Sequence, residues 1–170
     1  MISLRLLSKK PPQRFATQVR TFARLLPAIQ TAVASARWRQ KPRGLKRGVT
    51  FDIQLVTDAQ IAKLNASYRG KQGTTDVLSF SYIEGAIPVF EHETAGEIYI
   101  SLPQAARQAK AEKHSLSDEL AVLVMHGALH LMGYDHEKNT EEAGRMHRLE
   151  AKLLGTLAAH GLRAKGLIAR

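Results

Sequence analysis

The stretch that decides the fold reads His126-Gly-Ala-Leu-His130-Leu-Met-Gly133-Tyr-Asp-His136. On a helix, His126 and His130 project from the same face about one turn apart. Gly133 can adopt the left-handed conformation that ends a helix, so the chain can turn back and bring His136 to the same point. A lone histidine, or one such pair, is usually only a partly buried polar residue. The third histidine and the glycine at the turn therefore predict a metal site.

Three neutral imidazoles leave one coordination position for water or substrate, which is typical of a catalytic rather than a structural zinc. We expect one Zn²⁺ per chain, held by His126, His130 and His136. Nickel, or another divalent transition metal such as copper or iron, also suits this ligand set. Metzincin proteases share the spacing but carry their general base, a glutamate, directly after the first histidine. Gly127 stands there in this chain and cannot accept a proton, so ordinary peptidase chemistry is disfavoured.

Further motifs accompany the histidines. They are Leu64-Asn65-x-x-Tyr68-Arg69-Gly70-Lys71, then Thr75-Asp76-Val77-Leu78-Ser79-Phe80, Gly96-Glu97-Ile98 with Ser101, Glu119-Leu120, and Met146 with Glu150. Together with the histidine motif, these residues resemble the YbeY family of metal-dependent endoribonucleases over about residues 49 to 155. The chain departs from the family pattern at Thr74 and Ser81, where the family usually has proline, and at Glu97, where it usually has aspartate.

The resemblance implies a single-strand-specific endoribonuclease that acts in ribosomal RNA maturation, particularly of the small-subunit RNA, and in ribosome quality control. Its partners would be ribosomal RNA and ribosomal particles. The resemblance also implies that Arg69 is catalytic or contacts RNA, whereas the residue pattern alone would leave it a surface arginine. An arginine fork matches phosphate oxygens in a bidentate manner. Lys71 is a second candidate RNA contact, or simply a solvated lysine.

Two carboxylates flank the third histidine. Asp135 and Glu137 are candidates for orienting a ligand imidazole or for acting as a base. Each is equally well explained as a residue that faces solvent or caps the next helix. Two other functions also remain open at this point. One is a zincin-like peptidase or other metal hydrolase whose base lies outside the motif, and the other is a non-catalytic ribosome-assembly factor with a structural metal.

The net charge of +10 is concentrated at the start of the chain. Residues 1–51 contain twelve Lys and Arg and no Asp or Glu, whereas the other 119 residues have a net charge of −2. Such a basic segment favours a phosphate-binding surface for RNA. A solvated helix face or a mitochondrial transit segment are the alternatives. The densest cluster, which we treat as possible RNA contacts, comprises Arg37, Arg39, Lys41, Arg43, Lys46 and Arg47.

Length and composition fit one globular domain. The chain has 170 residues, is 44% hydrophobic and lacks cysteine, which excludes disulfides and thiol nucleophiles. No apolar run approaches the ~20 residues of a membrane span, and the first residues lack a signal-peptide pattern. We therefore expect a cytoplasmic protein without membrane association. The expected organisation is a single domain over 1–170, with a basic part at 1–48 and a possibly mobile tail at 161–170. The oligomeric state is not predicted.

Hydrophobic periodicity predicts alternating strands and helices. The expected strands are 2–7, 49–55, 76–82 and 96–101. The expected helices are 13–38, with Pro27 causing a kink or dividing it in two, 58–68, 101–113, 115–132 and 139–154. Residues 41–48 and 83–95 read as loops. The helix that carries the histidines is almost entirely apolar, so it should be buried. We predict an α+β fold in which a small mixed sheet of about four strands packs with several helices around this zincin-like metal helix.

Overall fold

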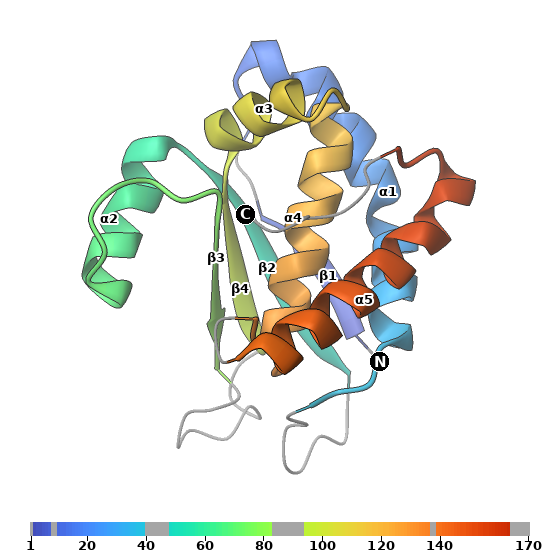
Figure 1. Ribbon diagram of the computed structural model, residues 1–170. Coiled ribbons are helices and arrows are strands. Elements are labelled where there is room, and N and C mark those ends of the chain that lie inside the picture. Colours follow the sequence, from blue (N-terminus) through green and yellow to red (C-terminus); the bar gives the residue numbers. More distant parts are fainter. Residues whose placement is uncertain (1, 8–9, 40–47, 83–93, 137–138, 164–170) are drawn as a thin grey trace.

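A mixed sheet of four strands forms one layer of the protein (Figure 1). The computed structural model describes residues 2–7, 10–39, 48–82, 94–136 and 139–163. The strands are β1 (Ile2–Leu6), β2 (Val49–Val56), β3 (Val77–Ser81) and β4 (Gly96–Ser101). They lie in the order β1-β2-β4-β3, in which β1, β2 and β4 are parallel and β3 is antiparallel to β4. The predicted α+β class and strand number are confirmed, and β3 is an edge strand.

The described residues also form five α-helices, which pack on the sheet or on one another. They are α1 (Ala16–Ser35), α2 (Asp58–Arg69), α3 (Leu102–Ala111), α4 (Leu116–Leu131) and α5 (Thr140–Leu157), and short 3₁₀ turns at Gln13–Phe15 and Ala158–His160 flank the first and the last. The N-caps of α2, α3, α4 and α5 are Thr57, Ser101, Ser115 and Asn139. Each of these side chains accepts a hydrogen bond from a backbone amide of the first turn, which satisfies a donor that the helix leaves unpaired.

Helix α4 is the centre of the fold, as predicted. It contacts β3, β4, α1, α3 and α5, and Figure 1 shows it between the sheet on one side and α1 and α5 on the other. Fifteen of its sixteen residues are buried. The exception is His130, which is partly exposed because it opens onto a cleft. Burial on every side explains why this helix lacks the polar stripe of a surface helix.

The two faces of the sheet differ in chemistry because successive side chains of a strand point to opposite sides. Ile53 of β2 and Ile98 of β4 are register partners and both are fully buried. The neighbouring residue Glu97 lies on the other face, where it accepts hydrogen bonds from the hydroxyls of Tyr82 at 2.5 Å and Tyr99 at 2.9 Å. Burial and this carboxylate raise the pKa of Tyr99 to about 12. The apolar face therefore seats α4, and the polar face carries its own hydrogen-bonded cluster.

Pro27 does not divide the first helix. The structure has one helix from Ala16 to Ser35 with Pro27 inside it, so the two-helix alternative is wrong. Buried residues continue past the proline on the same face, from Val19 and Phe22 to Ile29 and Val33. A proline inside a helix costs about 3 kcal/mol, and this continuous packing against the core offsets that cost.

Two further sequence expectations concern the ends and loops. Leu162, which falls in the expected tail at 161–170, is only 6% exposed and belongs to the hydrophobic core. The remainder of that segment from 164, most of the loop at 83–95, and residues 40–47 lie outside the described residues. Among the described helices, none combines the length and the apolar character that crossing a membrane requires.

Candidate metal centre and its cleft

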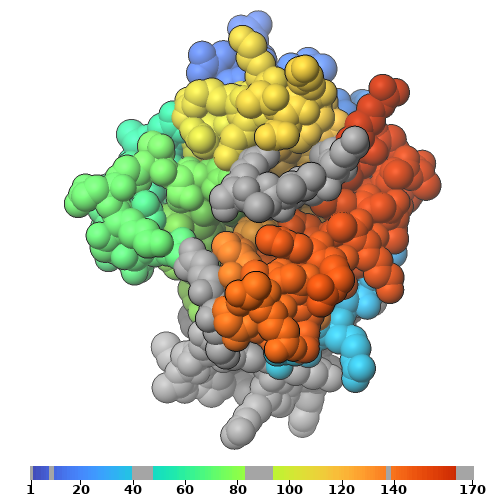
Figure 2. Space-filling view, in the orientation of Figure 1, coloured from blue at the N-terminus to red at the C-terminus, as the bar shows by residue number. Residues whose placement is uncertain are grey.

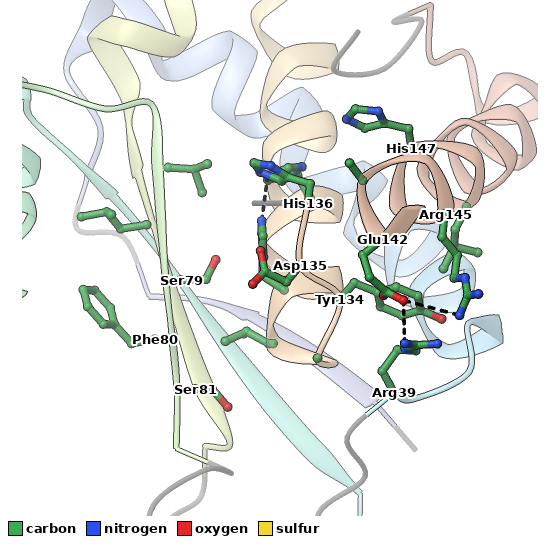
Figure 3. A pocket seen from close by; sticks show the side chains of 18 of the residues that line it. Arg39, Ser79, Phe80, Ser81, Tyr134, Asp135, His136, Glu142, Arg145 and His147 are labelled. Carbon is green, nitrogen blue, oxygen red and sulfur yellow. Dashed lines mark hydrogen bonds and ion pairs between the residues drawn. The ribbon is translucent and has the colours of Figure 1, made fainter. Parts of the chain in front are cut away.

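Three histidine side chains converge at the C-terminal end of α4 and the turn that follows it. Figure 3 shows the place of His136 in this cluster. One ligand nitrogen from each of His126, His130 and His136 lies within 4.8 Å of the other two. The Nε2 atoms of His126 and His130 are 3.1 Å apart. Two nitrogens bound to a tetrahedral zinc ion at ~2.05 Å would be separated by roughly 3.3 Å. The His126–His130 pair therefore already has the spacing of two ligands of one ion, and the nitrogen of His136 lies near enough to become the third ligand.

The turn after α4 explains how His136 reaches the other two. Gly133 has a φ of 90°, and its amide donates to the carbonyl of His130 while the amide of Tyr134 donates to that of Leu129. This pair of bonds is the Schellman motif, which ends a helix and reverses the chain. The hydroxyl of Tyr134 donates to the carbonyl of Arg37 at 2.8 Å, which ties the turn to the segment after α1. The predicted role of Gly133 is confirmed.

The surroundings of His130 favour its neutral imidazole. Burial, together with the nearby imidazoles of His126 and His136, lowers the pKa of His130 to about 4, although Asp135 opposes this effect. A metal ion binds the neutral form of histidine, whose ring nitrogen then has a free lone pair. His130 is therefore ready to coordinate at neutral pH without losing a proton.

A buried carboxylate stands behind the first histidine, and the sequence analysis did not assign it a role in the site. Glu150 of α5 is 1% exposed, and its Oε1 lies 3.5 Å from Nδ1 of His126. Neither atom makes a hydrogen bond within the described residues. A proton on Nδ1 would face this carboxylate and leave Nε2 as the lone pair turned toward the other histidines. The available signal was a glutamate on the apolar face of a helix, between Met146 and Leu153.

His147, which follows Met146 on α5, was also missed. Its ring stacks against that of His136, with centroids 6.4 Å apart and planes inclined by 23°. It belongs to the wall of the cleft, and its nitrogens are not among the three that converge.

An open cleft of about 1650 Å³ surrounds the histidines. The edge strand β3 forms one wall and α5 forms the opposite one (Figure 3). Ser79 and Ser81 project from β3 to the side on which His136 lies, whereas Phe80 between them projects to the opposite side. In the space-filling view, α2 and β3 in green lie on one side of this face of the molecule and α5 in orange to red lies on the other (Figure 2).

The structure brings several predicted cationic residues to this cleft. Arg69 is the last residue of α2, is exposed, and lines the cleft together with Arg37 and Arg39. Gly70 caps α2 in the left-handed conformation, with a φ of 63°, and thereby fixes where Arg69 leaves the helix. Arg39 donates to Glu142 of α5 at 2.9 Å. Lys71 is exposed but does not line the cleft.

Of the two carboxylates beside the third histidine, one is described. Asp135 is exposed, lines the cleft and lies close enough to His130 to influence its pKa. Glu137 and the basic residues Lys41, Arg43, Lys46 and Arg47 lie outside the described residues. Their predicted roles remain predictions.

Close packing of α4 against the sheet explains why residue 127 is glycine. A Cβ at this position would lie 2.8 Å from Cγ2 of Ile98 and 2.8 Å from Oγ of Ser79. Ordinary carbon contacts are about 3.5–4.0 Å. Helix α4 therefore approaches β3 and β4 more closely than any side chain larger than hydrogen permits, and a catalytic glutamate at this position has no room.

Comparison with known proteins identifies the family. The family described as "Endoribonuclease YbeY" matches residues 17–158. The chain belongs to this family. The match begins in α1, so YbeY similarity extends further toward the N-terminus than the motifs at residues 49 to 155 indicated.

Individual YbeY relatives agree. The Endoribonuclease YbeY of Symbiobacterium thermophilum is 42% identical over 116 residues, which cover 66% of this chain and 74% of the relative. That of Moorella thermoacetica is 45% identical over 118 residues, with 66% and 76% covered. The chloroplastic Endoribonuclease YBEY of Arabidopsis thaliana is 43% identical over 122 residues, which cover 71% of this chain and 20% of the relative. Among solved structures, and separately from these relatives, the solution structure of TM1509 from Thermotoga maritima matches with 22% sequence identity, a TM-score of 0.48 and all of both chains covered.

Proposed function

We propose that this YbeY family member is a metal-dependent endoribonuclease that acts in ribosomal RNA processing. One observation carries the proposal: three imidazole nitrogens converge in an open cleft that arginines also line. The cleft volume of about 1650 Å³ exceeds the roughly 300–1,000 Å³ of pockets that enclose a small ligand. The lining contains four arginines and three carboxylates. The size of the cleft and these arginines favour an extended polyanion as substrate.

The side chains of the cleft have different proposed roles in metal binding and catalysis. A bound divalent ion would polarise a phosphoryl oxygen and lower the pKa of a water molecule toward ~7. His126, His130 and His136 would hold that ion, and Glu150 would orient the ring of His126. Arg69 would neutralise the charge that builds on the phosphate. Asp135 is placed in the cleft where it could orient a ligand or accept a proton.

The finer proposals concern the metal, the substrate and the place of action. Three imidazoles are a common ligand set of catalytic zinc, so Zn²⁺ is the proposed ion, with nickel, copper or iron as alternatives. The substrate is proposed to be single-stranded RNA within small-subunit ribosomal RNA and ribosomal particles, including particles under quality control. Action in the cytoplasm is part of the same proposal. These points rest on the family resemblance and on the chemistry of the cleft.

Elemental analysis of the purified protein, combined with cleavage of single-stranded RNA, tests the proposal. We expect about one divalent ion per chain and cleavage that stops when a chelator removes it. His126→Ala and His130→Ala should lose both metal and cleavage. His160→Ala, an exposed histidine outside the cleft, is the matched control and should retain both. RNA cleavage that is indifferent to the chelator would contradict the metal-dependent reading.

The two alternative functions predict different results. A zincin-like hydrolase would cleave casein or peptides in a chelator-sensitive reaction and ignore RNA. The close approach at Gly127 speaks against the usual protease base, because a side chain there would collide with Ile98 and Ser79. A non-catalytic assembly factor would leave RNA intact and bind ribosomal particles equally well after His126→Ala.

A further inference from the structure

Exposed aromatic side chains gather at the metal cleft. Among the described residues, the large hydrophobic side chains that are exposed are Leu7 (46%), Tyr68 (71%) and Tyr82 (37%). A single exposed apolar residue needs no explanation. Two of these three, however, are tyrosines that line the cleft of the three histidines. Their position there requires a reason beyond chance exposure.

Neighbouring rings hold Tyr68 in place. Its ring centroid lies 5.0 Å from that of Phe80, with the planes inclined by 63°. Phe80 in turn lies 5.7 Å from Tyr99, inclined by 78°. Such edge-to-face contacts are favourable and fix the orientation of a ring. Tyr68 is nevertheless 71% exposed, so most of the tyrosine stays open to solvent despite its contact with Phe80.

We infer that Tyr68, supported by Phe80, is a stacking platform for an unpaired nucleobase of the RNA substrate, an inference that rests on the proposed function. Every nucleobase has an aromatic face, so such stacking tolerates any sequence. In a duplex the two faces of each base are covered by its neighbours, and a base must be unstacked before it can lie on the tyrosine. The platform thereby supplies a physical basis for selecting single strands.

The arginines that line the cleft favour a nucleic acid as the occupant of the platform. Arg69 follows Tyr68 directly in the sequence and lines the same cleft, which Arg37 and Arg39 also line. An aromatic ring next to cationic groups matches a polymer in which bases alternate with phosphates. An apolar peptide could contact the exposed ring of Tyr68, but it has no anionic groups to pair with the guanidinium groups of the cleft.

The platform lies in a part of this cleft that the edge strand β3 separates from the metal centre. Ser79 and Ser81 project to the side of β3 on which His136 lies, whereas Phe80 projects to the opposite side (Figure 3). Since Tyr68 contacts the ring of Phe80, it belongs to the same side as Phe80. RNA in the cleft would cross the edge of β3, with one phosphate at the histidines and the base of a nearby nucleotide on Tyr68. Tyr68 therefore contributes to substrate binding and not to the chemical step.

Steady-state cleavage of a single-stranded RNA oligonucleotide tests this assignment. Tyr68→Ala should raise KM by roughly 5- to 150-fold, the range for losing one stacked base, while kcat stays close to that of the parent. Tyr68→Phe keeps the ring and should restore most of the loss. Leu7→Ala removes an exposed apolar side chain outside the cleft and serves as the matched control.

A second substrate separates stacking from other effects. On an oligonucleotide whose bases around the cut are replaced by abasic ribose, Tyr68→Ala and the parent should have the same KM. The dependence of KM on salt should be unchanged in Tyr68→Ala, because an aromatic ring displaces no counterions. An equal loss on the abasic substrate, a flattened salt dependence caused by displacement of Arg69, or an unchanged KM on normal RNA would each overturn the inference. Failure of the proposed function shows separately, as a parent protein that does not cleave RNA.

Discussion

Replacing Gly127 by alanine adds one methyl group at the point where α4 meets the sheet. The new Cβ would lie 2.8 Å from side-chain atoms of both Ile98 and Ser79. Ile98 is fully buried and branched at Cβ, so it has little freedom to move aside. The strain must be met by shifting α4 or the strands, and α4 carries the metal ligands.

Two opposing contributions set the magnitude. Overfilling a packed core costs about 1–3 kcal/mol. Replacing a helical glycine by alanine stabilises the helix by about 0.5–1 kcal/mol. Gly155 provides the control that separates them, because it also lies in a helix, α5, and nothing lies within 4 Å of a Cβ built on it. Gly155→Ala should therefore show the gain alone, and the two variants should differ in the free energy of unfolding by the packing cost of about 1–3 kcal/mol.

Urea denaturation of the two variants and the parent measures this difference. For a chain of 170 residues, 1 kcal/mol corresponds to about 2–4 °C in Tm, so thermal unfolding gives an independent reading. Adding Ser79→Ala to Gly127→Ala removes one of the two close contacts and should recover part of the loss beyond the sum of the single effects. If Gly127→Ala is stabilised as much as Gly155→Ala, the close packing of α4 on the sheet is not what requires glycine at this position.

The remaining predictions concern the cleft and its surroundings. Arg69→Ala should abolish RNA cleavage with metal content and fold intact, whereas Lys71→Ala, just outside the cleft, should change cleavage little. Glu150→Leu should weaken metal affinity by about 10- to 100-fold in a competition with a chelating dye, and Glu150→Gln should be affected less. Neutralising the basic residues of segment 37–47 should flatten the salt dependence of RNA binding, by about 0.7 in slope per lost phosphate contact, and leave metal binding unchanged. Burial, and after it the carboxylate of Glu97, raise the pKa of Tyr99 to about 12, above the ordinary value of 10. The neutral phenol of Tyr99 therefore contributes to stability below pH 10, and this contribution disappears as the pH rises through 12. The absorbance of the tyrosinate will follow the titration.

Local sequence patterns predicted the helices and strands but not how they are arranged in space. The alternation in β2 and the start of α4 near residue 115 are properties of neighbouring residues, so both could be predicted. The strand order β1-β2-β4-β3 depends on which strands pair across the chain, and no local pattern encodes that choice. Pro27 shows that tertiary packing can also overrule a local pattern. The packing of α1 against the core outweighs the tendency of proline to end a helix.

The same distinction applies to the site. The three histidines and Gly133 lie within eleven residues of one helix and the turn after it. The convergence of His126, His130 and His136 could therefore be predicted from their spacing. Glu150 comes from α5 and reaches His126 only through packing of the two helices. The aromatic contact between Tyr68 and Phe80 likewise joins residues of α2 and β3 that no periodicity connects.

The burial of α4 on all sides affects how a mutational scan of this protein should be interpreted. A surface helix has positions where substitutions are tolerated, and sensitive positions stand out against them. Helix α4 has almost none, since fifteen of its sixteen residues are buried. Most substitutions in it will lower the amount of folded protein in the cell, as core substitutions generally do. Loss of activity along 116–131 therefore does not identify catalytic residues unless protein abundance is measured in the same experiment.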